Sequence, residues 1–448
     1  MSVVTSPRGA ERIVLAIDTS NFVELNENLE LAEKLGARAV KLGLEVLTSQ
    51  GVHTASEQAE VYGLAWKADA KLDDIPTTVA KTVQVYRELA HPPEAITMHA
   101  NAGREAIRLA QEAAGAEIDM LVVTELTTKE NDEIEEESQR SRLDQVLFRG
   151  DKAGRAGAHG LVASGAEVAH LRVQESTSEM QYMIPGTRSA GANANDQKNI
   201  ITPAAAVLDG ADELVIGRQV SQAEDSEAAM LSLIHEIQQA EEMMERIQNF
   251  KERAVTAGLM DPDGVHHEFK SGMHGQKLDF DVIFKQNEAL AAELNQLVAD
   301  YIELRYGMKP DMVVGVADGT NGPAQEVAAH LSVPGFESRK LADKKTLLLR
   351  DQTVDMIEQE HPSFAVVYED VGTTGSSSVQ IAKQLLAAGV EKVVVLNIWK
   401  RTARLQKLEE AGIEYAAMIN EPLPTYSAEQ CAESGFCSNP NETFIPRS

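Results

Sequence analysis

Short apolar runs alternate with longer amphipathic segments through the first 220 residues of the chain. No hairpin-type turn separates one apolar run from the next, so the pattern predicts strands alternating with helices and therefore a parallel α/β fold. Eight such units over about 240 residues predict a (β/α)8 TIM barrel, with a doubly wound sheet as the alternative. The predicted strands lie at 13–18, 39–43, 64–71, 95–100, 120–126, 160–165, 182–186 and 213–218.

The pattern changes after the barrel. A long helical pattern runs through 226–255, and its first half is expected to be the last barrel helix. Turn residues follow at 258–264. Further strand-like runs separated by helical segments then predict a small, open α/β sheet of three or four strands. We therefore expect a barrel domain at 1–245, a helical linker at 246–262 and a second α/β domain at 263–448.

Composition narrows the classes of function. The 448 residues suggest two or three domains. The net charge of −29 disfavours a nucleic-acid or anionic-membrane surface. The N-terminus lacks the apolar core of a signal peptide, and no apolar run is long enough to span a membrane. The two cysteines, Cys431 and Cys437, exclude a disulfide framework, are too few for a zinc site, and favour a reduced, cytoplasmic setting.

Charged residues gather at the ends of the first three predicted strands. In "KADAKLDDIPTTV", Asp69 and Lys71 end the third strand, and Asp74 lies in the loop beyond. Alternate strand residues face the same side, so Asp69 and Lys71 are expected to point together into the barrel mouth. Lys41 ends the second strand and Asp18 the first.

Two interpretations of these charged residues are possible. They could form a structural salt-bridge network, but burying several charges is costly and contributes little stability. Because perturbed charges cluster at active sites, and because barrel active sites lie at strand ends, the set predicts an active site instead.

The ends of the seventh and eighth predicted strands suggest a second part of the site. They read "IPGTRSAG" and "IGRQV", and barrels commonly bind phosphate after strands seven and eight. An ordinary flexible loop is the alternative. The predicted phosphate-binding groups are the backbone around Pro185, Gly186 and Gly217 and the side chains of Gln197 and Arg218.

These segments resemble orotidine 5′-monophosphate decarboxylases over about residues 12–220. "DAKLDDIPTTV" is similar to the family's Asp-x-Lys-x-x-Asp-Ile-Pro signature. Related sugar-phosphate synthases share the charged part but lack the Ile-Pro continuation and the "DQ…TP" block. The other similar blocks, in the same order, are "VKLGLEV", "ITMHANAG", "LVVTELTT", "GLVASGAE" and "PGTR…DQ…TP…GADELVIGR".

The resemblance implies a role for each charged residue. Lys71 protonates C6 of the pyrimidine as carbon dioxide leaves, and Asp69 lies against the substrate carboxylate. Lys41 and Asp74 complete the array, with Asp74 reaching the site of a second subunit in a homodimer or larger homo-oligomer. No metal or organic cofactor is implied. The other implied contacts are Asp18 and Thr78 at the ribose, Ser164 at the pyrimidine, and Gln197 and Arg218 at the phosphate.

The second half contains a separate candidate site. In "VVYEDVGTTGSSS", Glu369 and Asp370 end a predicted strand, and a polar turn opens the next helix. Amides and hydroxyls at a helix N-terminus suit a phosphate, and the two acids suit ribose hydroxyls, directly or around Mg²⁺. A plain strand–turn–helix connection is the alternative. The turn residues are Thr373, Thr374, Gly375, Ser376 and Ser377.

This stretch resembles the phosphoribosyl pyrophosphate motif of type I phosphoribosyltransferases. "FKSGMHG" and "VVGVADGTNGPAQEVAAHL" look like the orotate branch, and the likeness covers about 256–420. It implies Mg²⁺ with the pyrophosphate ligand, Lys270 at phosphate and Arg401 near the orotate base. The family's Lys-x-His-Gly loop element is replaced by "ESRKLADKKTLLLRD". The lysines there that are candidates for pyrophosphate are Lys340, Lys344 and Lys345.

Three hypotheses follow for the whole chain. The first is a fusion resembling uridine monophosphate synthase with reversed domain order, acting on orotate, phosphoribosyl pyrophosphate and orotidine monophosphate. The second keeps the decarboxylase and makes the C-terminal half a nucleotide-sensing or scaffold module. The third is a ligand-binding protein with a structural charge lattice.

Overall fold

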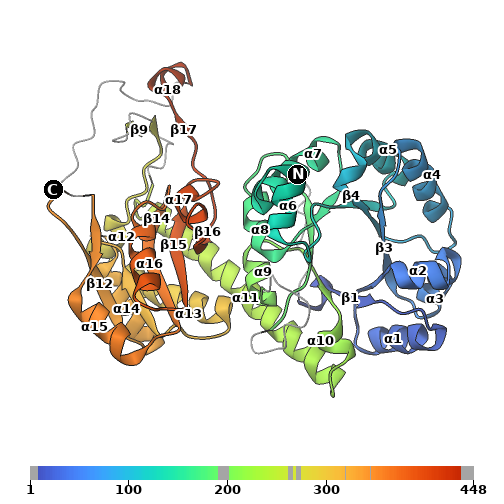
Figure 1. The fold of residues 1–448 in the computed structure, drawn as a ribbon, viewed down its shortest axis with the longest axis horizontal. Helices are drawn as coiled ribbons and strands as arrows, with labels where there is room; N and C mark the ends of the chain where they lie inside the picture. The colour runs from blue at the N-terminus through green and yellow to red at the C-terminus, as the bar shows by residue number, and fades with distance from the viewer. Residues whose placement is uncertain are drawn as a thin grey trace. The chain divides into compact units, whose positions relative to one another are not determined.

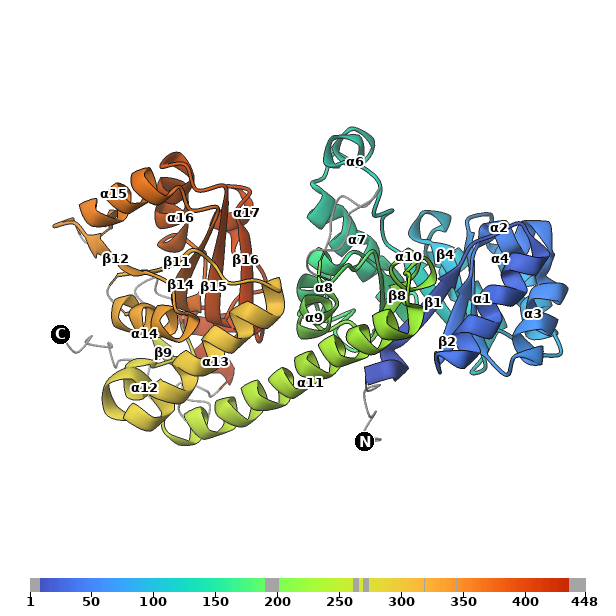
Figure 2. The same cartoon turned by 90° about the horizontal axis from the view of Figure 1, so that it is seen from below.

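The computed structural model describes residues 9–189, 201–260, 266–268, 274–317, 319–343 and 345–434. The chain divides into two compact units, Met1–Glu242 and Met243–Ser448 (Figure 1). The division lies inside helix α11 (Ser226–Thr256), which continues without a break through the predicted boundary at 245 (Figure 2).

The first unit is a closed barrel of eight parallel strands, each hydrogen-bonded to the next, with β1 pairing to β8 to close the ring. This confirms the predicted (β/α)8 barrel and rules out the doubly wound alternative. The strands are β1 (Ile13–Ile17), β2 (Ala39–Leu42), β3 (Ala65–Leu72), β4 (Ala95–His99), β5 (Asp119–Val123), β6 (Gly160–Val162), β7 (Gln181–Pro185) and β8 (Glu213–Ile216).

Helices follow the strands and begin at residues suited to that place. Asn21 caps α1 by accepting hydrogen bonds from the N–H groups of Val23 and Glu24. Proline occupies the first turn of α4 and α9, where its missing N–H costs nothing. The helices are α1 (Phe22–Lys34), α2 (Leu44–Ser49), α3 (Val52–Val61), α4 (Pro76–Arg87), α5 (Arg104–Ala114), α6 (Asn131–Ser138), α7 (Arg142–Arg155), α8 (Gly165–Leu171), α9 (Pro203–Leu208) and α10 (Arg218–Ser221), with 3₁₀ turns η1 (Gly9–Arg12) and η2 (Ala100–Ala102).

The middle of the barrel interior is apolar. Side chains from β4 to β8 pack together there, with the half-buried Ala16 of β1 against them. Strands buried on both faces carry near-continuous apolar runs, which explains why the run pattern located them. The buried members of this cluster are Ala95, Leu121, Val123, Val162, Met183 and Val215.

Charged side chains close the end of the barrel where the strands begin. Lys67 of β3 is 2 % exposed, and its Nζ lies 3.0 Å from Oε1 of the fully buried Glu213 at the start of β8. Arg38 contacts the same oxygen at 3.0 Å and reaches Glu94 at 3.4 Å. We call Arg38, Lys67, Glu94 and Glu213 the basal charge cluster. It lies at the opposite end of the strands from the predicted active site.

The second unit contains an open, mixed sheet in the order β13-β12-β11-β14-β15-β16. All neighbours are parallel except the edge strand β13, which pairs antiparallel with β12. A separate small sheet has the order β17-β10-β9. The strands are β9 (His267–Glu268), β10 (His274–Gly275), β11 (Met312–Gly315), β12 (Gly335–Lys340), β13 (Leu347–Leu349), β14 (Phe364–Gly372), β15 (Lys392–Lys400), β16 (Glu414–Ile419) and β17 (Thr425–Tyr426).

Helices cover both faces of the six-stranded sheet. Helices α13 and α14 pack together, with α14 on β11 and β12, whereas α15 and α16 contribute to the core cluster on the other face (Figure 2). The open α/β sheet was predicted, but with three or four strands rather than six. The helices are α12 (Asp281–Gln286), α13 (Glu288–Tyr306), α14 (Asn321–Leu331), α15 (Asp351–Glu360), α16 (Ser378–Ala387), α17 (Gln406–Glu409) and α18 (Ala428–Ser434).

Two strands of the six-stranded sheet, β12 and β13, lack the sequence pattern by which strands are predicted. β12 reads "GFESRK" and is largely polar, and β13 is an apolar run of only three residues, which is too short to mark a strand. Both are assigned through their pairing with distant segments, which the local sequence does not encode.

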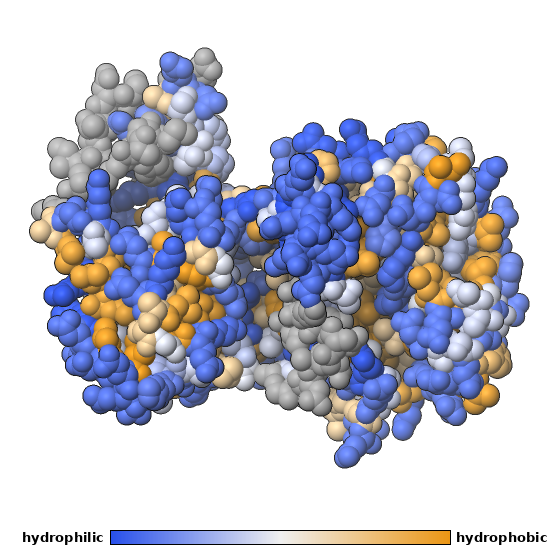
Figure 3. Space-filling view, viewed as in Figure 1, coloured by the Kyte–Doolittle hydropathy of each residue, from blue (hydrophilic) through white to orange (hydrophobic). Residues whose placement is uncertain are grey.

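Two expectations about the surface and the cysteines can be compared with the structure. All acidic residues of α6 are exposed, and hydrophilic residues dominate this part of the barrel unit in Figure 3. Within the described ranges, no helix has both the length and the apolar character needed to cross a membrane. Cys431 is disulfide-bonded, contrary to the expectation of reduced cysteines.

The basal charge cluster yields a prediction about stability. Replacing Glu213 with Ala leaves the Lys67 ammonium buried without its close partner, and such a change costs about 3–5 kcal/mol of unfolding free energy. Denaturation should be followed by Trp66 fluorescence in a Trp399→Phe background, so that the signal reports the barrel alone. The control is Glu105→Ala, which removes an exposed partner of Arg108 and should leave the midpoint nearly unchanged. Equal midpoints for both variants would contradict the prediction.

Candidate active site

Two lysines share one carboxylate at the C-terminal ends of β2 and β3. Asp69 is buried, and its Oδ2 accepts a hydrogen bond from Lys71 Nζ at 2.7 Å and another from Lys41 Nζ. The sequence prediction that these three side chains meet is therefore matched by their geometry. The side chain of Lys71 is 32 % exposed, so its ammonium is open to a ligand in the barrel mouth.

A bulge in β3, rather than simple strand alternation, brings Asp69 and Lys71 together. The register of β3 against β4 is regular up to Ala68 and resumes only at Leu72. Lys71 has a φ of +47°, in the left-handed region that non-glycine residues rarely occupy. Bulges often re-aim a side chain beside an active site, and here the bulge carries the lysine.

Opposing effects set the charge of Asp69. Burial alone would raise the pKa of its carboxyl, but the ammonium groups of Lys41 and Lys71 lower the pKa to about 2. Asp69 is therefore a carboxylate at any pH near neutral, and the cluster of two lysines and one aspartate has a net positive charge.

Asp18 lies beside this cluster at the end of β1. Partial burial raises the pKa of its carboxyl, while the charge of Lys41 opposes that rise. Its carboxylate occupies the space next to the Cα of Gly43, since a Cβ at Gly43 would come within 1.6 Å of Asp18 Oδ1. Gly43 was not singled out from the sequence, although its position directly after β2 is a signal for close approach.

Asp74 and Thr78 do not join the cluster within one chain. Both side chains are exposed, and Asp74 Oδ1 accepts a hydrogen bond from the N–H of the next residue, Ile75. The predicted four-residue array thus contains three residues in this chain, and Asp74 faces outward in the β3–α4 loop.

Ser164 lies at the end of β6 and caps the start of α8. Its N–H donates to Glu167 Oε2 at 2.8 Å, and the residue is 2 % exposed. It forms a capping box with Glu167, in which the Ser164 side chain faces the N–H of Glu167. The predicted contact with a substrate therefore falls on a buried hydroxyl at a strand end.

The predicted phosphate-binding segments lie next to each other. Pro185 at the end of β7 pairs with Val215 of β8, two residues before Gly217. Gly186 has a φ of +80°, which allows the chain to turn there. Arg218 follows as an exposed residue at the start of α10. Gln197 lies outside the described residues.

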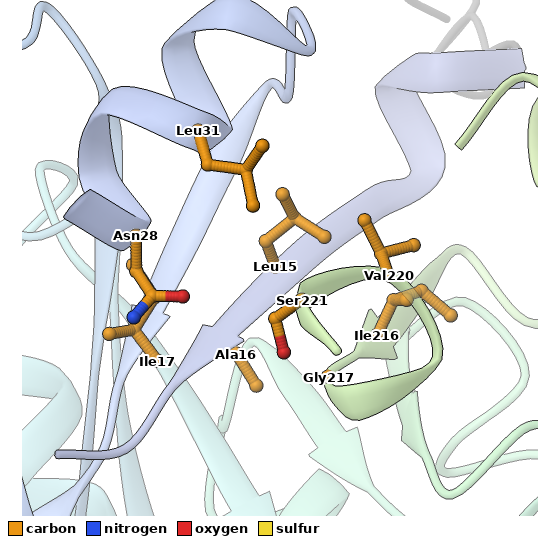
Figure 4. A pocket seen from close by; sticks show the side chains of 9 residues that line it. All are labelled: Leu15, Ala16, Ile17, Asn28, Leu31, Ile216, Gly217, Val220 and Ser221. Atoms are coloured by element: carbon orange, nitrogen blue, oxygen red, sulfur yellow. The ribbon is translucent and has the colours of Figure 1, made fainter. Parts of the chain in front are cut away.

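A small cavity lies behind the end of β8, and it is not the candidate site. Its volume is about 10 Å³, enough for roughly one water molecule. The cavity lies between β1 and α1 on one side and β8 and α10 on the other (Figure 4). Its lining residues are Leu15, Ala16, Ile17, Asn28, Leu31, Ile216, Gly217, Val220 and Ser221.

Known proteins match the barrel unit of this chain. The model of the "Orotidine 5'-phosphate decarboxylase / HUMPS family" matches residues 11–233. The orotidine 5′-phosphate decarboxylase of Sphingopyxis alaskensis is 38% identical over 229 residues, which cover 50% of this chain and 96% of that protein. The chain belongs to this decarboxylase family.

Two further relatives show the same extent of match. The orotidine 5′-phosphate decarboxylase of Ruegeria pomeroyi is 36% identical over 232 residues, covering 51% of this chain and 94% of that protein. A crystal structure of orotidine 5′-phosphate decarboxylase from Lactobacillus acidophilus matches at 27% identity with a TM-score of 0.41, covering 50% of this chain and 97% of that one. The family model matches within the barrel unit, here called the decarboxylase unit.

Outside the decarboxylase unit, two neighbouring acids end β14. The pKa of Glu369 is raised to about 7, chiefly by burial, with a hydrogen bond from Ser378 opposing the rise and the charge of Asp370 adding to it. Burial also raises the pKa of Asp370, against the hydrogen bond that its Oδ1 accepts from the N–H of Val371 at 2.8 Å. In the part of the unit that the structure describes, Glu369 Oε2 is buried without a hydrogen-bond partner.

The polar turn after β14 is held by a distant segment. Thr373 O accepts a hydrogen bond from the Thr402 hydroxyl at 2.6 Å, and Thr374 O accepts one from the N–H of Lys407 at 3.0 Å. Gly375 has a φ of +75° and lies against Leu408, so a side chain there would be excluded. The turn is therefore shaped before any ligand binds.

The segment predicted to replace a flexible catalytic loop is a tight hairpin. The N–H of Leu341 donates to Thr346 O at 2.9 Å between β12 and β13. Lys340 ends β12, and its charge opposes the rise in the pKa of both Glu369 and Asp370. Lys344 and Lys270 lie outside the described residues.

Arg401 lies beside the end of β14. Its N–H donates to Gly372 O at 3.0 Å, and its Nη2 donates to Gln276 O at 3.0 Å. Burial lowers the pKa of its guanidinium. The structure therefore brings Arg401 to the same strand end as the acids and the polar turn. In the described ranges, no three His, Cys, Asp or Glu side chains gather as a metal site.

The raised pKa of Glu369 predicts how stability depends on pH. Between pH 4.5 and about 7 the folded chain holds a proton that the unfolded chain has released, so stability falls as pH rises through this window, by roughly 3 kcal/mol. Glu369→Gln should remove this fall and raise the melting temperature at pH 8.

Trp399 fluorescence in a Trp66→Phe background measures the melting of this unit. Glu358→Gln on the exposed face of α15 is the control and should keep the wild-type pH profile. If both variants have the wild-type profile, Glu369 is not buried as the structure indicates.

Proposed function

We propose that the decarboxylase unit converts orotidine 5′-monophosphate to uridine 5′-monophosphate in de novo pyrimidine biosynthesis. The observation that carries the proposal is the cluster of Lys41, Asp69 and Lys71 at the strand ends of a barrel that belongs to the decarboxylase family. The Ile75-Pro76 continuation favours this reaction over that of the sugar-phosphate synthases, whose signature lacks it.

The cluster suits the electron flow of this reaction. The bond from C6 to the carboxylate breaks, carbon dioxide leaves, and the electron pair remains on C6. The Lys71 ammonium stabilises this developing negative charge and then gives its proton to C6. Asp69 repels the substrate carboxylate but not the neutral product, an effect whose catalytic share is debated. No step of this route needs a metal or organic cofactor.

Binding energy would come from groups remote from C6. The adjacent ends of β7 and β8 present Gly186, Gly217 and Arg218 for the phosphate. Ser164 offers its buried hydroxyl to the pyrimidine, and Asp18 lies near the expected ribose. Contacts of this kind can offset the unfavourable placement of one carboxylate against another.

The first test concerns Lys71. Lys71→Ala should lower kcat for orotidine monophosphate by roughly 10⁴-fold or more, because the proton donor and the positive charge are lost together. Lys81→Ala, which removes an exposed lysine on α4, is the matched control and should retain normal turnover. Circular dichroism checks that both variants are folded. Near-normal turnover by Lys71→Ala would refute the mechanism.

We also propose that two chains share each active site. Asp74 is exposed in the β3–α4 loop and does not reach the cluster of its own chain, which leaves it available to a second copy. Ile75 is 64% exposed beside it, as expected for a residue that an interface covers. The assembly proposed is a homodimer or a larger homo-oligomer.

Mixing two inactive chains tests the shared site. Lys71→Ala and Asp74→Ala chains should each be inactive, and their mixture should recover up to about a quarter of wild-type activity, since one hybrid site in each mixed dimer has both residues. Subunit exchange is checked with differently tagged chains. No recovery after demonstrated exchange would exclude the shared site.

For the second unit, we propose binding of phosphoribosyl pyrophosphate with Mg²⁺, in a cytoplasmic enzyme. Its support is the strand end where Glu369, Asp370, Arg401 and the polar turn come together. Transfer to orotate also needs stabilisation of the departing pyrophosphate, for which Lys340 at the end of β12 is the candidate. The tight β12–β13 hairpin favours the alternative of a nucleotide-sensing or scaffold module without transfer.

Calorimetry and product analysis distinguish the transferase from the nucleotide-sensing or scaffold module. Phosphoribosyl pyrophosphate with Mg²⁺ should bind the full chain, and Asp370→Asn should weaken binding about tenfold through lost contacts to the ribose hydroxyls. Asp355→Asn, exposed on α15, is the control. Formation of orotidine monophosphate, or of the uridine monophosphate that the decarboxylase unit makes from it, from orotate would establish the transferase. Binding without product would favour the sensor, and absence of binding would exclude both.

A further inference from the structure

Thr97 is a polar residue in the middle of strand β4, between Ile96 and Met98, and the sequence motifs assign it no role. Its side chain is 1% exposed, in the run "AITMH". Both hydrogen-bond partners of its hydroxyl belong to the charged cluster. We propose that Thr97 is a positioning residue for the decarboxylation, whose hydroxyl holds the Asp69–Lys71 bulge in its active geometry. This inference rests on the proposed function of the decarboxylase unit.

The pairing of β3 and β4 explains why a side chain is needed at this place. Ala68 pairs with Ile96, and Leu72 pairs with Met98, so Thr97 alone stands opposite the three residues of the bulge. An extra residue in a bulge leaves a backbone group without its ladder partner. The N–H of Lys71 is such a group, and it donates to Thr97 Oγ1 at 2.9 Å. The hydroxyl therefore replaces a backbone carbonyl.

The same hydroxyl also orients the carboxylate of Asp69. Thr97 Oγ1 donates to Asp69 Oδ1 at 2.9 Å, whereas Asp69 Oδ2 takes the hydrogen bonds from both lysines. The two carboxylate oxygens are thus divided between one hydroxyl and two ammonium groups. This division fixes the rotation of the carboxylate and turns Oδ2 toward the lysines.

Comparison with another buried threonine separates this role from ordinary packing. Thr124 at the end of β5 is fully buried, but its hydroxyl donates only to the backbone, at Val162 O. The Thr97 hydroxyl instead joins the backbone of one catalytic group to the side chain of another. It also supports the left-handed φ of Lys71, a conformation that persists only where surrounding contacts hold it.

Two substitutions isolate the hydroxyl. Thr97→Val keeps the shape and removes the hydroxyl, and Thr97→Ser keeps the hydroxyl and removes a methyl group. Because a displacement of about 1 Å can cost roughly 100-fold in rate, Thr97→Val should lower kcat by about that factor. KM should stay within about threefold, since the phosphate contacts lie on β7 and β8. Thr97→Ser should restore kcat to within about fivefold of wild type.

Thr177→Val is the matched control. Thr177 is fully buried, and its hydroxyl donates to Leu171 O at 2.7 Å, before β7 and away from the strand ends that carry the site. This change should lower stability without changing kcat. Equal loss of kcat in Thr97→Val and Thr177→Val at matched stability, or wild-type kcat in Thr97→Val, would overturn the positioning role.

A crystal structure of Thr97→Val gives a readout that does not depend on the reaction. The separation between Lys71 Nζ and Asp69 Oδ2 should exceed hydrogen-bonding distance, and φ of Lys71 should leave the left-handed region. An unchanged bulge would overturn the proposal even if the wild type decarboxylates the substrate. If the wild type is inactive, the proposed function fails, and the crystal structure alone then decides whether Thr97 holds the bulge.

Discussion

The decarboxylase unit depends on one buried carboxylate that is shared by two ammonium groups. Asp69 lowers the cost of burying Lys41 beside Lys71, and the lysines keep Asp69 ionised despite its burial. Removing Asp69 would leave two ammonium groups side by side without a counter-charge in a region of low dielectric. The cluster therefore requires a scaffold that holds the ends of two adjacent strands in a fixed relation, and a closed barrel provides it.

The barrel interior is organised around this requirement. Charges lie at both ends, with an apolar layer between them. Lys67 and Asp69 are two residues apart on β3 and therefore share a face of the strand, yet one pairs with Glu213 at the base and the other with Lys41 at the mouth. The apolar layer keeps the two charged groups apart, so the basal charge cluster contributes to stability while the upper one remains available for chemistry.

The second unit follows a different principle. Glu369 and Asp370 are adjacent, partly buried acids, and loss of hydration raises the pKa of both. The folded unit is therefore less stable when Glu369 ionises than it would be with a neutral residue. A ligand that donates hydroxyl groups or brings a cation would relieve this cost, so binding and stability are coupled at this strand end.

The sequence by itself determined the barrel, the positions of its eight strands and the meeting of Lys41, Asp69 and Lys71, because apolar periodicity and strand-end position are local properties of the chain. Only the tertiary structure decided that β3 bulges at Lys71, that Thr97 stands opposite the bulge, and that the second sheet has six strands. These features depend on the register between segments distant in sequence, and register is set by packing and hydrogen bonds that no local pattern encodes.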